Sequence, residues 1–148
     1  FTRVCATCHR LHGRGAEVGP DITANGRASF DQLLTNVFDP SLVIGAAYRS
    51  WTVVTDEGRV VSGLLVEEGP DRVVLKVPGG TQETLPRAAI EDMRQNETSL
   101  MPEGLERQCS PRDIADLLAY LALDRPPSDP EARPIPGTPS TTAPAPKR

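Results

Sequence analysis

The sequence predicts two amphipathic helices that flank a small antiparallel β meander. Apolar residues recur with the period of a helix over residues 30–38 and again over residues 111–123. Between these segments, short runs rich in β-branched residues are separated by glycine-containing loops, a pattern typical of hairpins. The chain of 148 residues has room for one domain, or for one domain with an insert.

The first predicted helix follows Ser29, whose hydroxyl can cap the first turn. Its apolar positions fall at i, i+3, i+4, i+7 and i+8: Phe30, Leu33, Leu34, Val37 and Phe38. Pro40 ends the helix at Asp39, because the residue before a proline is pushed out of the helical region. We expect this apolar stripe to be ordinary core, with part of it in contact with any group that the domain binds.

The predicted meander spans residues 51–85 and contains about four strands. These are the runs 51–55, 59–66, 72–77 and 81–85. A sheet of this size must pack one face on neighbouring structure to be stable. The following segment, residues 88–94, predicts a helical turn in which Met93 packs inward.

The last predicted helix has a clear start, with Ser110 as a cap, Pro111 at the first helical position and Asp113 near the positive end of the helix dipole. Its apolar stripe consists of Ile114, Leu117, Leu118 and Leu121. Residues 124–148 contain a proline every few positions among small and polar residues. This composition predicts a disordered tail.

Composition argues against several classes of partner. The net charge of −4 and the isoelectric point near 5.2 provide no basic surface for nucleic acid. No apolar run approaches the roughly 20 residues that a membrane-spanning helix needs. The chain starts at Phe1 without an initiator methionine or a visible signal peptide. We therefore expect it to be a fragment of a longer protein.

The motif that carries chemistry is Cys5-Ala6-Thr7-Cys8-His9, a C-x-x-C-H sequence. Two thiols at this spacing can add across the two vinyl groups of one haem, and the adjacent imidazole can then bind the iron. A C-x-x-C pair alone also occurs in zinc and thiol redox sites. The histidine that follows makes covalent attachment of one c-type haem the specific prediction.

Several further stretches, in the same order, resemble a known family. They are the glycine loop that leads to Gly19-Pro20-Asp21-Ile22, the Phe38 to Ser41 turn, the hairpin 48–63 and Ser99-Leu100-Met101-Pro102. Together with the motif they resemble class I cytochromes c, and in particular the haem-binding domain of planctomycete and verrucomicrobial type. The resemblance covers residues 1–123 and implies a mainly α, cytochrome c-like haem domain. Residues 51–85 would be an inserted meander, and the N-terminal helix of the family would be truncated.

The resemblance also implies roles for residues outside the motif. The carbonyl of Pro20 would accept the ring N–H of His9, and Met101 would be the distal iron ligand. We prefer Met101 to Met93 because a thioether ligand needs an extended loop that can approach the iron. Arg27, Tyr48 and Trp51 have the cationic or polar-tipped side chains best able to reach a haem propionate.

Histidine–methionine ligation implies one-electron transfer without catalytic activity of the module itself. The resemblance further implies export to the periplasm or beyond, as the C-terminal part of a larger exported protein. Its expected partners are a redox donor and acceptor, or a dehydrogenase domain upstream.

Two alternatives remain open. Cys5, Cys8, His12 and Cys109 could form a structural zinc site, since C-x2-C-x3-H is a spacing that zinc accepts. A haem enzyme or ligand sensor could use a displaceable Met101. A thioredoxin-like dithiol is disfavoured because no βαβ pattern surrounds the motif.

Overall fold

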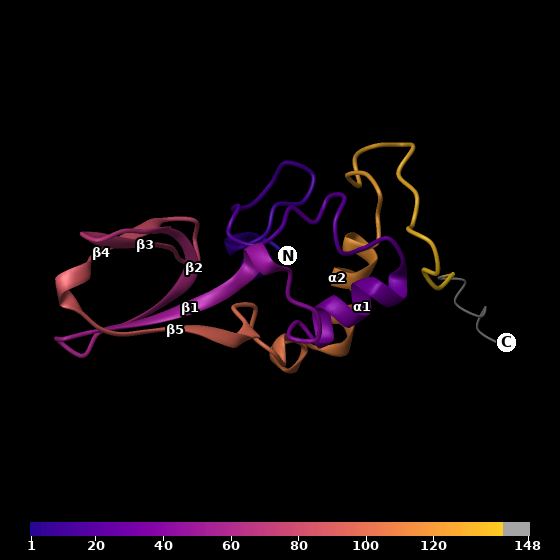
Figure 1. Cartoon of the computed structure of the whole chain (residues 1–148). Coiled ribbons are helices and arrows are strands. Elements are labelled where there is room, and N and C mark those ends of the chain that lie inside the picture. The colour runs from indigo at the N-terminus through magenta and orange to yellow at the C-terminus, as the bar shows by residue number, and fades with distance from the viewer. Residues whose placement is uncertain (141–148) are drawn as a thin grey trace, which may run out of the picture.

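The computed structural model describes residues 1–140 of the chain and is built from one antiparallel sheet and two short α-helices (Figure 1). The helices are α1 (Phe30–Phe38) and α2 (Pro111–Leu121). The strands are β1 (Arg49–Thr55), β2 (Val60–Glu68), β3 (Arg72–Lys76), β4 (Gln82–Pro86) and β5 (Ile90–Ser99). Single 3-10 turns cover Cys5–Thr7, Ala46–Tyr48, Arg87–Ala89 and Leu105–Gln108.

The expectation of a mainly α domain with a small inserted meander was wrong. The two α-helices have only nine and eleven residues, whereas the sheet has five strands and is the largest element of the fold. The strand order is β4-β3-β2-β1-β5, and every neighbouring pair is antiparallel. The four predicted strands form β1 to β4, so the sheet is larger than expected by one long strand.

The additional strand is β5, which covers the segment predicted to hold a helical turn around Met93. Its apolar residues Ile90 and Met93 are three positions apart, which is a helical spacing. The segment is nevertheless extended, because it pairs with the free edge of β1, for example Met93 with Val53. Met93 does pack inward, against the core of the sheet.

The sheet bends so that β3 and β4 lie over β1 and β5 (Figure 1). The core lies between these two parts of the sheet. The buried residues come from four strands: Val53, Val61, Val73, Leu75 and Leu85. Trp51 and Met93 pack against them at the margin. The sheet therefore has a hydrophobic core of its own, separate from that of the helical part.

The helical part is organised around a second core, and both predicted helices are confirmed. Ser29 Oγ accepts a hydrogen bond from the amide of Gln32 at the start of α1. Ser110 and Asp113 form a reciprocal capping box at the start of α2. The buried members of this core are Leu11, Leu33, Leu121, Ala122 and Ile135.

Ile135 belongs to the segment that was expected to be disordered. Up to Ser140 the segment after α2 is ordered, and it turns back along the helices. The amide of Ile135 donates to the carbonyl of Ala122, and the carbonyl of Pro136 accepts from Phe30 at the start of α1. Residues 141–148 of the expected tail lie outside the described residues.

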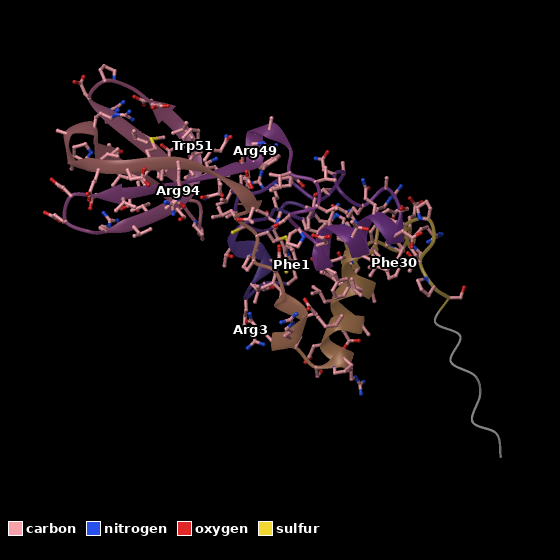
Figure 2. All side chains as sticks on the ribbon, turned by 60° about the horizontal axis from the view of Figure 1, so that its bottom comes forward. Phe1, Arg3, Phe30, Arg49, Trp51 and Arg94 are labelled. Carbon is pink, nitrogen blue, oxygen red and sulfur yellow. The ribbon has the colours of Figure 1, made fainter. Side chains whose placement is uncertain are left out.

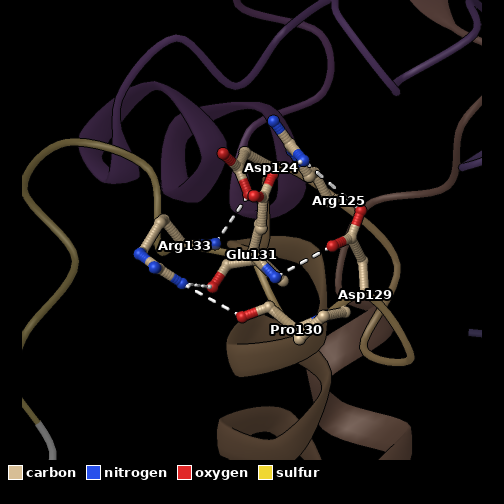
Figure 3. A network of polar contacts seen from close by, with 7 residues as sticks. Asp124, Arg125, Asp129, Pro130, Glu131 and Arg133 are labelled. Carbon is tan, nitrogen blue, oxygen red and sulfur yellow. Dashed lines mark hydrogen bonds and ion pairs between the residues drawn. The ribbon is translucent and has the colours of Figure 1, made fainter.

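A network of polar contacts joins the beginning of this returning segment to its middle (Figure 3). Asp124 Oδ1 accepts the amide of Arg133, and the guanidinium of Arg125 lies 2.6 Å from a carboxylate oxygen of Glu131 and 3.5 Å from one of Asp129. We call residues 124–138 the C-terminal strap. The strap is rich in proline and contains no helix or strand. These polar contacts and the buried side chain of Ile135 hold it in one conformation against the helices.

Candidate functional site

The C-x-x-C-H motif folds as a tight 3-10 turn over Cys5–Thr7. The amides of Cys8 and His9 both donate to the carbonyl of Cys5, at 3.1 and 2.8 Å. This winding gathers the two thiols and the imidazole at one place. Both cysteines are free thiols and half-buried, and burial raises the pKa of Cys5 above its ordinary value of 9.0.

The ring of His9 is held by the glycine-rich loop that follows the motif. Nδ1 donates to the carbonyl oxygen of Pro20 at 2.9 Å, which leaves Nε2 available as a ligand atom. The loop also packs tightly on the ring and its backbone. A Cβ on Gly19 would lie 2.7 Å from His9 Cε1, and one on Gly15 would lie 2.1 Å from the His9 carbonyl oxygen. Only glycine allows both approaches.

His9 lines a cavity that has two adjoining lobes, each of about 230 Å³. Six residues line both lobes: Cys5, His9, Pro20, Tyr48, Ser99 and Met101. Leu33 and Val37 of α1 and Ile44 of the following loop form an apolar wall on one side. Cys8, Val18 and Leu64 lie on the other. The cavity therefore lies between the motif, α1 and the start of the sheet.

Of the two methionines in the sequence, Met101 lines this cavity. It lies in the loop that follows β5, directly before Pro102. Met93 lies within β5, where its sulfur is 3.6 Å from the guanidinium of Arg87. A cavity lined by two thiols, an imidazole with a free ring nitrogen and a thioether has the donor set that a covalently attached haem requires.

Arg27 was expected to reach a haem propionate, but in the structure its side chain binds backbone carbonyls instead. Arg27 is 5% exposed, and its guanidinium donates to four backbone carbonyls. They are those of Ile22, Thr23, Leu121 and Leu123. Arg27 thus ties the glycine-rich loop to the end of α2, although it also forms part of the cavity wall.

Tyr48 and Trp51, the other two candidates for a propionate contact, lie in different parts of the fold. Tyr48 lines both lobes and is 37% exposed, so its ring lies at the mouth of the cavity. Trp51 lies on β1 and packs against the core of the sheet, and Figure 2 shows it among the strands near Arg94. The sequence could not separate them, because an amphipathic ring suits either place.

The residues of the alternative zinc set do not form a metal site. Among residues 1–140, no group of three or more histidine, cysteine, aspartate or glutamate side chains could hold a metal ion. His12 occupies a turn with a φ of 49°, and its Nε2 is buried without a hydrogen-bond partner. Burial, followed by the charge of Arg27, lowers the pKa of His12 below its ordinary value of 6.5. Cys109 is exposed.

Sequence reasoning missed the polar residues that hold the Met101 loop. Ser99 lines both lobes, and its amide donates a hydrogen bond to the hydroxyl of Ser41. The available signal was weak: one serine two residues before the methionine and another directly after Pro40.

Comparisons with protein-family models and with curated proteins found no match to this chain. In the part of the chain that the structure describes, no helix is long and apolar enough to span a membrane.

Proposed function

We propose that this protein is a c-type cytochrome module that carries one haem and transfers single electrons. The observation that supports this most strongly is that His9 and Met101, 92 positions apart, line the same cavity as the two thiols of the motif. The donor atoms of a histidine–methionine site and its covalent anchors are thus all at one place.

Each residue has a definite part in this proposal. Cys5 and Cys8 would hold the haem through thioether bonds, and His9 would bind the iron through Nε2. Pro20 fixes the orientation of the imidazole and increases its strength as a donor, as hydrogen-bond partners of ligating histidines generally do. Met101 would provide the second iron ligand through its sulfur. Haem, when bound, supplies reversible one-electron oxidation and reduction of its iron.

The apolar wall around the cavity also fits electron transfer. Leu33, Val37 and Ile44 give the site an apolar lining, and the polarity around a haem is one of the protein's means of setting its potential. Two protein ligands leave no open position for a substrate. We propose redox donor and acceptor proteins, or a linked dehydrogenase domain, as partners, and an exported location as for the haem-binding domains that the sequence resembles.

Haem attachment can be tested on protein produced in a host that assembles c-type cytochromes. We expect one haem per chain that survives acid–acetone extraction. Cys5→Ala and Cys8→Ala should each leave at most one thioether bond, whereas the exposed Cys109→Ala should retain wild-type haem. Extractable or absent haem in the wild-type protein would refute the proposal.

The distal ligand can be tested by a pair of methionine variants. Met101→Ala should keep covalent haem but lower the midpoint potential by a measurable part of the roughly 0.8 V range that axial ligands span. It should also make the ferrous iron bind carbon monoxide rapidly. Met93→Ala, in the sheet, should change neither property. Rapid carbon monoxide binding by the wild-type protein would favour a ligand sensor over electron transfer.

A further inference from the structure

The loop that carries Met101 is fixed by a hydroxyl two residues before it. Ser99 is the last residue of β5, and its Oγ accepts a hydrogen bond from the amide of Met101 at 3.1 Å. This is a local serine turn, which determines the direction in which the chain leaves the strand. The path of residues 99–101 therefore depends on one side chain that itself lines the cavity.

Ser99 is in turn held by the other side of the cavity. Its amide donates to Ser41 Oγ at 3.2 Å, and Ser41 directly follows Pro40, a residue of the cavity wall. Since α1 ends at Phe38, this hydrogen bond joins the end of the helix to the end of β5. The two serines form a chain of contacts from the helical wall of the cavity to the backbone of Met101.

The register of the sheet brings Ser99 to this place. Arg49 pairs with Ser99, but Trp51 pairs with Gln95, so β5 has two additional residues in this interval. Bulges of this kind redirect a strand and are common beside functional sites. Asn96, within the interval, donates to Ser50 Oγ and to Thr52 Oγ1, both at 3.0 Å. Ser50 is 2% exposed, so the irregular pairing is stabilised by a polar contact that is buried on the side of β1.

We propose that Ser99 and Ser41 are positioning residues for Met101, so that the sheet serves to deliver the distal sulfur to the cavity. This inference rests on the proposed function in one respect, that Met101 is an iron ligand. A ligand on a free loop loses conformational entropy when it coordinates, whereas a loop already fixed by hydrogen bonds loses less. Loss of the serine hydroxyls should therefore weaken coordination without removing the sulfur.

The first measurement is hydrogen exchange of the Met101 amide in the purified chain, followed by NMR. Because a single hydrogen bond contributes about 0.5–1.5 kcal/mol, Ser99→Ala should accelerate this exchange by about two- to tenfold. Ser99→Thr keeps the hydroxyl and should restore slow exchange. Thr55→Ala is the matched control, since it removes a hydroxyl that also accepts a backbone amide, that of Arg59, at the other end of β1. Unchanged exchange in Ser99→Ala overturns the inference, whether or not haem is attached.

The second measurement is coordination in the haem-loaded protein. Ser99→Ala and Ser41→Ala should each increase the rate of carbon monoxide binding to the ferrous iron by several fold and lower the midpoint potential. Ser99→Thr and Thr55→Ala should match the wild type. Wild-type rates and potentials in both alanine variants overturn the positioning role. Absence of haem from the wild-type protein overturns the proposed function instead, so the two failures are distinguishable.

Discussion

His9 Nδ1 lies 2.9 Å from the carbonyl oxygen of Pro20, and Gly19, the residue before this proline, lies against the imidazole ring. The hydrogen bond fixes the tautomer with the proton on Nδ1, and the close contact limits rotation of the ring. The orientation of the proposed proximal ligand is thus decided by the backbone of the loop that follows the motif.

Gly19→Ala should disturb this arrangement. The added Cβ would lie 2.7 Å from Cε1 and 3.0 Å from Nδ1 of His9, closer than side-chain carbons approach one another, so the ring must shift. We expect a loss of about 1–3 kcal/mol in unfolding free energy, together with less haem bound per chain. Gly69→Ala is the control, because its Cβ would meet nothing nearer than 3.6 Å. Equal haem content in the two variants would show that the loop does not orient His9.

Arg27→Lys should destabilise the fold rather than alter a haem contact. A lysine cannot reproduce the planar set of bonds to carbonyls of the loop and of the end of α2. Buried carbonyls without partners should lower the unfolding free energy by about 2–4 kcal/mol, as measured by urea denaturation. Arg94→Lys, on an exposed side chain, should change it by less than about 0.5 kcal/mol. A variant of wild-type stability with an altered midpoint potential would instead support a propionate contact.

Ile135→Ala tests whether the C-terminal strap is part of the core. Ile135 is 8% exposed and packs with Leu33 and Leu121. Truncation to alanine should cost about 2–3 kcal/mol in urea denaturation, the lower part of the range for buried isoleucines. Val60→Ala, at a side chain that is 63% exposed, should cost less than about 0.5 kcal/mol. If both variants unfold at the same urea concentration, the strap does not contribute to stability.

The capping box of α2 predicts a dependence of stability on acidic pH. Hydrogen bonds from Ser110 lower the pKa of Asp113 below its ordinary value of 3.8, and the charged carboxylate is therefore favoured in the folded state. Its contribution is fully present above the unfolded pKa and is lost as the pH falls through the lower, folded pKa. The stability difference between wild type and Asp113→Asn should hold near neutral pH and shrink below about pH 4 in urea denaturation. Ser110→Ala should show the same trend, and a difference independent of pH would exclude the mechanism.

Local signals in the sequence predicted the elements whose stability is local. The start of α1 at Ser29 and of α2 at Ser110 is encoded in a few adjacent residues, and both starts are confirmed. The four hairpin strands are also confirmed, because each turn lies between the strands that it joins. The fold class was nevertheless wrong, because the mainly α expectation came from the family resemblance and left out a strand without a local signal.

That element is β5, and the C-terminal strap is a second case. Strand β5 is extended because β1 offers it an unpaired edge, and β1 lies more than 30 residues earlier in the chain. The strap follows a fixed path because Ile135 fills a gap beside α1 and α2, although the prolines around it predict disorder. Neither partner can be identified from the periodicity of the segment itself.

The sequence by itself determined the chemical groups of the candidate site. Cys5, Cys8 and His9 are brought together by one turn of the chain, so their spacing alone specifies the arrangement. The tertiary structure decided the rest, because packing across the chain selects among side chains of similar chemistry. It placed Met101 and Tyr48 on the cavity, and it directed Arg27 to backbone carbonyls and Trp51 to the core of the sheet.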